Sequence, residues 1–360
     1  MNRATLSAIS GVGGKGPACF LIEAGGVRLL VDLGYGPQPG LFPNVDGLGK
    51  VDALLLSHGH KDHAGGLSLL EKIGNPPIYA TEFVVRGLLP TLETHILPLH
   101  GSADVFGVPI QTGRSGHAPG GIWIRFAIGD GLLYMGDHCS ASILYAFDSP
   151  PPTSTLVLDG SYGSDDIAVA ERFNKFDRLC ASPGVLLPVP GDGRGPEIAL
   201  YLLRQGCKTL HTDDAVQTAL NEVAEYGAAS LWNGLAGEIR RLADRAPPIR
   251  DCTGVMLASR ADGTAGEAAA LIAAWENFPE PEIIFTGYIP ARTPAERLVK
   301  NGRASYLRWN VHPRLSENAA LVASVKPQTV VPAFCEREHL GVLADAFAPA
   351  RVNLASPLPL

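Results

Sequence analysis

The residues best suited to chemistry lie together in LLLSHGHKDHAGGL, residues 54–67. This segment places three histidines and an aspartate within six positions: His58, His60, Asp62 and His63. Imidazole and carboxylate groups are good ligands for Zn²⁺ and related metals. A tight turn would direct the first two histidines to one position and the last two residues to a neighbouring one, about 3.5–4 Å away. We therefore predict a metal centre; the alternative is a polar loop that happens to be rich in histidine.

The elements around this segment predict a β-rich frame that would hold it. The apolar run at 53–57 predicts a buried strand directly before the histidines, and residues 63–73 have helical spacing after them. Two strand-like runs at 18–23 and 27–32 flank a glycine pair, which predicts a hairpin. Further strands are expected at 77–80, 108–112, 122–128, 131–135 and 155–159.

The pattern changes near Ser161. From about 165 to 280, helical patterns alternate with strand-like runs such as VLLPVP and VMLAS. This alternation predicts an α/β unit with a parallel sheet. We expect one domain made of two segments, 1–163 and 291–360, with an α/β domain inserted at 164–290.

Bulk composition narrows the classes of partner. The 360 residues are 46% hydrophobic, which is ample for a large core. The net charge of −7 counts against non-specific binding of nucleic acid by charge, although it leaves room for a local basic groove. Six scattered cysteines, no signal-peptide pattern and no apolar run of about 18 residues lead us to expect a cytoplasmic protein without a membrane partner. Oligomeric state is not predicted.

The histidine-rich segment resembles the HxHxDH signature of the metallo-β-lactamase superfamily. Asp32, which ends VRLLVD, resembles the early aspartate that supports the metal loop. His117, in SGHAPGG, resembles the third histidine of the first metal site, and Asp137, in LLYMGDH, resembles the carboxylate that bridges both metals. Neighbouring side chains of an extended segment point in opposite directions, so we expect Asp137 to face the metals and His138 to turn away. The resemblance implies an αββα sandwich and one or two zinc ions.

Later motifs resemble the β-CASP group of this superfamily, which includes RNA 3′-end processing endonucleases, bacterial ribonucleases and DNA-repair nucleases. The inserted α/β domain would then be a β-CASP-like cap. His312, followed by a helix and VKPQTVV, resembles a histidine of this group. The other matching segments are LVLDGSYG at 156–163, PVPGDGRGPEIALYLL at 188–203, VMLASRADGTAG at 255–266 and IIFTGYIPARTPAERL at 283–298.

Phe334 departs from the β-CASP pattern. In nucleases of the group a histidine usually follows the KPxxVV strand and binds the second metal, whereas phenylalanine cannot ligate. The second site would keep only Asp62, His63 and the shared Asp137. We expect a weaker second site, or one completed by water or a nearby side chain; His339 is close in sequence.

The resemblance also implies a hydrolytic mechanism. A metal-activated hydroxide would be held at the first metal by His58, His60 and His117, and Asp62 would orient it and accept its proton. His312 would donate a proton to the leaving group, and Asp159 would orient the His312 ring. The alternative for His312 is an exposed histidine near a turn. The alternative for Asp159 is a turn residue at a strand end.

Arg194 lies in a Gly-rich turn before a predicted helix. Its guanidinium, together with backbone N–H groups at the helix start, would suit a substrate phosphate. The alternative is a solvated loop arginine.

Three functions remain open from the sequence. The first is a β-CASP-like phosphodiesterase or nuclease acting on RNA or DNA, which the insertion, Arg194 and His312 favour. The second is a small-molecule hydrolase that cleaves an ester, lactone, thioester or phosphodiester, which the acidic charge and Phe334 favour. The third is a non-catalytic metal-binding scaffold. The intact first metal motif argues against the third, because a structural zinc site normally has no open position.

Overall fold

A computed structural model describes residues 4–191 and 193–360, which divide into two compact units. The first unit contains the chain as far as Ala141 together with Ala146–Asp166 and His312–Leu360. The second contains Ser142–Tyr145 and Ile167–Val311. The second unit thus extends past the expected boundary at 290, because β16 (Ala304–Tyr306) pairs with β15 (Glu282–Phe285) in its sheet.

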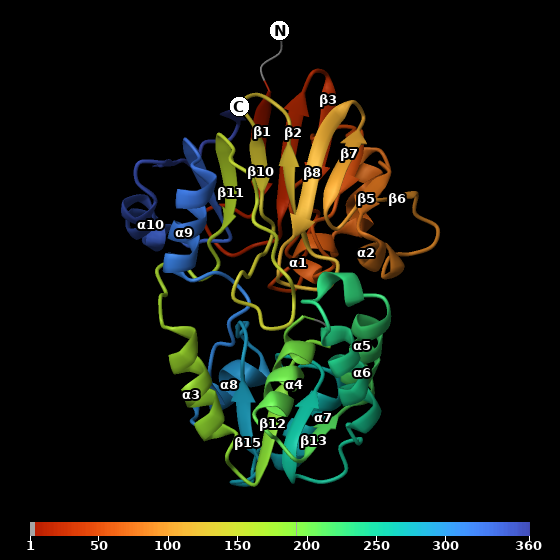
Figure 1. The fold of residues 1–360 in the computed structure, drawn as a ribbon, viewed down its shortest axis with the longest axis vertical. Helices are drawn as coiled ribbons and strands as arrows, with labels where there is room; N and C mark the ends of the chain where they lie inside the picture. The colour runs from red at the N-terminus through yellow and green to blue at the C-terminus, as the bar shows by residue number, and fades with distance from the viewer. Residues whose placement is uncertain (1–3, 192) are drawn as a thin grey trace. The chain divides into compact units, whose positions relative to one another are not determined.

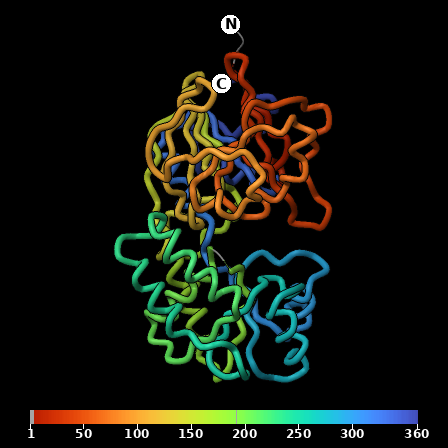
Figure 2. The backbone as a smooth tube through the Cα atoms, turned by 90° about the vertical axis from the view of Figure 1, so that its right-hand side faces the viewer, coloured from red at the N-terminus to blue at the C-terminus, as the bar shows by residue number. Residues whose placement is uncertain are grey.

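The first unit contains two seven-stranded sheets (Figure 1). One has the order β19 (Leu358–Pro359), β1 (Thr5–Ser10), β2 (Cys19–Ala24), β3 (Val27–Val31), β4 (Ala53–Leu55), β5 (Ile78–Ala80), β6 (Thr94–Ile96). The other has the order β18 (Arg351–Val352), β17 (Thr329–Ala333), β11 (Thr155–Asp159), β10 (Leu132–Tyr134), β9 (Ile122–Phe126), β8 (Val108–Arg114), β7 (Gly101–Val105). Because β1 pairs with β19, the beginning and end of the chain lie side by side (Figure 2).

Alternating side chains pack the two sheets face to face. In β3, Leu29 and Val31 enter the core between the sheets, whereas Leu30 packs on the outer face. This alternation is the two-residue period of a strand. The outer face of one sheet packs on η1 (Leu67–Ile73) and α2 (Glu82–Arg86). The outer face of the other packs on α9 (Leu315–Val325) and α10 (Leu340–Phe347), preceded by η3 (Arg337–His339). The layers are therefore helix, sheet, sheet and helix, as predicted.

The second unit is a five-stranded parallel sheet with helices on both faces. The strand order is β13 (Leu210–Thr212), β14 (Gly254–Ala258), β12 (Gly184–Pro188), β15, β16. Its helices are α3 (Val169–Leu179), α4 (Arg194–Arg204), α5 (Asp214–Glu225), η2 (Ala228–Ser230), α6 (Leu235–Arg245), α7 (Gly266–Trp275) and α8 (Pro294–Lys300). Strand β12 is apolar throughout because Val185 and Leu187 enter one core while Leu186 enters the other.

The helix expected at 63–73 is interrupted. The structure has a short α1 (Lys61–Ala64) and then η1, separated by Gly65 and Gly66. A Cβ on Gly65 would strike the carbonyl oxygen of Lys61, and one on Gly66 would lie 2.7 Å from the carbonyl oxygen of Leu33. The close approach of this turn to the end of β3 explains the break.

Among the described residues, every helix is too short or too polar to traverse a lipid bilayer.

Candidate metal centre

The candidate site lies where several strands of the first unit end. Strand β4 is followed by the histidine-rich turn, β8 by the loop that carries His117, and β10 by Asp137. Asp159 is the last residue of β11. Two glycines allow close approaches in these loops. A Cβ on Gly34 would strike the Asp62 carbonyl, and a Cβ on Gly116 would strike the Cys139 carbonyl. The packing of two sheets thus gathers side chains that are far apart in the sequence.

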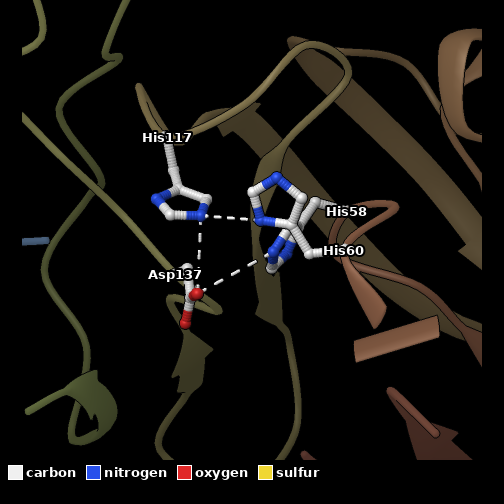
Figure 3. A group of neighbouring side chains, drawn as sticks. All are labelled: His58, His60, His117 and Asp137. Atoms are coloured by element: carbon white, nitrogen blue, oxygen red, sulfur yellow. Dashed lines mark hydrogen bonds and ion pairs between the residues drawn. The ribbon is translucent and has the colours of Figure 1, made fainter. Parts of the chain in front are cut away.

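Four residues form the first group of candidate ligands: His58, His60, His117 and Asp137. Their side chains point toward one another (Figure 3). His117 Nε2 is 3.0 Å from His60 Nδ1 and 3.5 Å from Asp137 Oδ2. His58 Nε2 is 3.8 Å from the same carboxylate oxygen. Ligands bonded to one tetrahedral Zn²⁺ at about 2.0–2.1 Å would be about 3.3 Å apart, so these separations fit a shared cation.

The buried atoms of this group also fit a metal ion. His58 is 1% exposed, yet its Nε2 atom makes no hydrogen bond. Buried polar atoms in proteins rarely lack a hydrogen bond. Burial, and then His63 and His60, lower the pKa of His58 well below its usual value. A neutral imidazole is the form that binds a metal.

Asp62, His63 and Asp137 form a second group. His63 Nε2 is 3.1 Å from Asp137 Oδ1, while Asp137 Oδ2 faces the first group. Asp137 therefore offers one oxygen to each group, as a bridging carboxylate would. The buried Phe334 ring lies against the His63 ring, with 5.1 Å between their centroids. His339 instead contacts Ser164 Oγ at 3.0 Å through Nδ1 and is in none of the groups found among the described residues.

Asp32 supports the histidine-rich turn from a fully buried position. Its Oδ2 atom is 2.7 Å from His63 Nδ1 and accepts hydrogen bonds from Ser57 Oγ at 2.8 Å and Tyr134 Oη at 2.6 Å. Its Oδ1 atom accepts from the Ser57 backbone N–H at 2.7 Å. The sequence reasoning missed Ser57 and Tyr134. A tyrosine in an apolar strand next to Asp137 was an available signal, because a buried phenol usually finds a partner.

Asp137, Asp159 and His312 form a third group. His312 Nδ1 is 2.8 Å from Asp159 Oδ2 and 3.8 Å from Asp137 Oδ2. Burial raises the pKa of Asp159, but the adjacent His312 more than offsets this and the pKa lies below its usual value. The His312 ring also lies 4.9 Å from the His117 ring. The expected acid–histidine pair is thus in contact beside the first group.

Two further residues lie outside these groups. His138 is buried, its ring lies 6.1 Å from Phe147, and its backbone N–H donates to Asp159 Oδ2 at 3.3 Å. Burial lowers the pKa of His138 to about 4. Arg194 is the first residue of α4 in the second unit, where its guanidinium packs against Gly287.

Residues 12–177 match the model of the metallo-beta-lactamase superfamily. Over this segment the chain is similar to that superfamily. Its predicted resemblance to the β-CASP nuclease group is also confirmed, because its curated relatives include a ribonuclease and a cleavage factor.

Three curated relatives are, by name, a transcription termination factor, a ribonuclease and a cleavage and polyadenylation factor. The chain is 27% identical to Transcription termination factor FttA of Cenarchaeum symbiosum over 55% of this chain and 38% of the relative. It is 29% identical to a ribonuclease of Thermus thermophilus over 52% of each chain. It is 23% identical to Cleavage and polyadenylation specificity factor 73 of Drosophila melanogaster over 91% of this chain and 59% of the relative. The chain spans about half the length of these relatives.

A solved structure resembles the whole chain. It is a protein of unknown function from Enterococcus faecalis V583, with a TM-score of 0.63, 14% identity and 99% coverage of both chains. At this identity the likeness shows the fold alone.

Proposed function

We propose that this protein is a metal-dependent phosphodiesterase that cleaves RNA or DNA. The observation that carries the proposal is the first ligand group beside the Asp159–His312 pair: all its ligand atoms lie within 4.8 Å of one another. Metal ligands and an acid–histidine pair together suit hydrolysis, which needs an activated water and a proton for the leaving group. The names of the relatives add support for a nucleic-acid substrate.

Each residue has a distinct role in this proposal. A Zn²⁺ ion, when bound, would lower the pKa of a water and polarise a phosphoryl oxygen. His58, His60 and His117 would hold the ion through the nitrogens that face the cluster. Asp137 would bridge two positions through its two oxygens, and Asp62 would accept a proton from water.

His312 would protonate the leaving oxygen. Its Nδ1 contacts Asp159, so Nε2 is the nitrogen left to carry that proton. Asp159 would orient the ring through its contact with Nδ1 at 2.8 Å. Asp159 is itself held by the backbone N–H of Ser161 at 2.9 Å.

Arg194 is retained as a candidate contact to a substrate phosphate. It begins α4, an 11-residue helix, and the N–H groups of a helix start favour anions. We also propose a cytoplasmic location, supported by six cysteines that are scattered along the chain without a CxxC pair.

A small-molecule hydrolase is the second candidate. It is favoured by the net charge of −7 and by the Phe334 ring beside His63, which adds apolar surface to the site. Such a protein would cleave an ester, lactone, thioester or small phosphodiester.

Metal analysis joined to a substrate panel tests the proposal. The full chain would be assayed for zinc and for cleavage of bis-nitrophenyl phosphate, single-stranded RNA, single-stranded DNA and a lactone. We expect His58→Ala and Asp137→Ala to lose metal and turnover, while His95→Ala, at a half-exposed site on β6, loses neither. Metal and turnover that survive both ligand substitutions would refute the proposal. Cleavage of the lactone alone would favour the second candidate.

A further inference from the structure

Tyr134 joins the two sheets at the metal-bearing edge of the first unit. It is the last residue of β10 in one sheet, and its hydroxyl donates to Asp32, which follows β3 in the other. Both side chains are buried, with exposures of 1% and 0%. A charge-assisted hydrogen bond of 2.6 Å between buried groups is strong and directional.

Tyr134 lies just before the segment that carries a candidate ligand. Asp137, the shared ligand of all three groups, is three residues further along the chain. Gly136 also touches the other sheet, since a Cβ there would lie 2.8 Å from Ser57 Oγ. Tyr134 therefore sets the distance between the segment that carries Asp137 and the turn that carries the histidines.

Asp32 passes this restraint to His63. An ionised carboxylate only accepts hydrogen bonds, so His63 must carry its proton on Nδ1, 2.7 Å from Asp32. With a metal ion bound at the second group, Nε2 would be the unprotonated nitrogen that faces it. Partners of this kind orient ligating histidines and raise their basicity.

Ser57 extends the restraint to His58. Its hydroxyl donates to Asp32 at 2.8 Å and can accept from His58 Nδ1 at 3.1 Å. Both histidines then present Nε2 to the cluster. Asp32 has a left-handed backbone with φ of 57°, a conformation that aspartate adopts more readily than most residues.

We propose that Tyr134 is a positioning residue of the metal centre, acting through Asp32 on His63 and on the spacing to Asp137. This inference rests on the proposed metal-dependent function. The Tyr134 hydroxyl donates to Asp32, which is in none of the three groups found among the described residues, so Tyr134 holds the site rather than reacting in it.

A matched pair of variants tests this role. Tyr134→Phe removes one oxygen and keeps the ring, which packs on Phe20 at 5.3 Å between centroids. Tyr145→Phe makes the same change at a tyrosine that is also 1% exposed but donates to the Gly193 carbonyl in the second unit. The full-length proteins would be titrated with Co²⁺ and followed by visible absorption, which reports ligand geometry. Circular dichroism would check folding.

We expect Tyr134→Phe to weaken Co²⁺ binding about tenfold and to alter the absorption band, with Tyr145→Phe like the wild type. In a His63→Ala background, Tyr134→Phe should cause a smaller further loss than in the wild type, because the part of its effect that passes through that imidazole is already gone. Equal titrations of the two tyrosine variants would overturn the role of Tyr134 and leave the metal centre intact. A wild-type protein that binds no Co²⁺ would overturn the proposed function itself.

Discussion

At the scale of single residues, two adjacent positions with similar ligand chemistry have different surroundings. Asp137 belongs to all three candidate groups among the described residues, whereas His138 belongs to none and packs against Phe147. Asp137 is also the residue whose two oxygens face different groups. Loss of Asp137 should therefore affect all three groups.

Phe334 should limit the number of ions. The second group has three ligands, and the Phe334 ring occupies the space beside His63. We expect about one tightly held zinc per chain in the wild type and about two in Phe334→His, because zinc prefers four ligands. Histidine also tolerates the φ of 59° at this position better than a bulky apolar side chain does.

Phe334→Leu is the matched control, since leucine cannot ligate. Elemental analysis after dialysis against a fixed free zinc concentration would give the stoichiometry. Equal zinc content in Phe334→His and Phe334→Leu would contradict this assignment.

His312 should serve turnover rather than metal binding. It contacts Asp159 at 2.8 Å, and a general acid commonly contributes about 10²–10⁴-fold to rate. We expect His312→Ala to keep its zinc and to lose about 100-fold or more in kcat. We expect Asp159→Asn to lower kcat as well. Loss of zinc from His312→Ala would mean that the third group is itself a metal site.

At the scale of elements, the turn between β4 and η1 depends on its fit against the end of β3. The backbone N–H of Leu33 donates to the His63 carbonyl at 2.8 Å, and that of Ala18 donates to the Asp62 carbonyl at 2.8 Å. Gly34 lies where these segments meet. Asp62 and His63, two candidate ligands of the second group, are thus held by backbone contacts between neighbouring loops.

Gly34→Ala should disrupt this fit. The added methyl group would strike the Asp62 carbonyl oxygen, and backbone cannot move aside as a flexible side chain can. We expect a loss of about 1–3 kcal/mol in the free energy of unfolding together with weaker zinc binding. Gly341→Ala, in α10 of the same unit, meets nothing within 4 Å and is the control. Denaturant unfolding and zinc titration would measure both; wild-type behaviour of Gly34→Ala would contradict this account.

At the scale of the whole molecule, the chain contains two units with separate cores. Every candidate metal ligand lies in the first unit, while Arg194 lies in the second. The first unit is built from separated segments of the chain, so the ligands from β4 to β11 and His312 come from both sides of the long insertion. Metal binding should therefore be coupled to the stability of one unit.

Removal of zinc should affect the two units unequally. A ligand at 100 times its Kd stabilises the state that binds it by about 2.7 kcal/mol. We expect chelation to accelerate hydrogen exchange in peptides from β4, β10 and the segment at Asp159, with little change in β12 and β14. Mass spectrometry of exchanged, digested protein would resolve these peptides. A uniform change across both units would argue against a metal confined to the first.

The type of candidate site can be predicted from local sequence. The HxHxDH spacing behind an apolar strand is local, and a strand followed by a turn positions neighbouring side chains whatever the rest of the fold does. The period of two in the strands and the alternation of helices and strands after residue 165 likewise predicted the layers of each unit.

Which distant groups meet depends on the packing of the folded chain. The contact of Asp32 with Tyr134, of Asp159 with His312, and of Phe334 with the His63 ring each depends on how the sheets and their loops pack. Such contacts join positions that lie far apart in the chain, and no local propensity encodes them. The break between α1 and η1 arose in the same way, from a close backbone approach that spacing alone does not reveal.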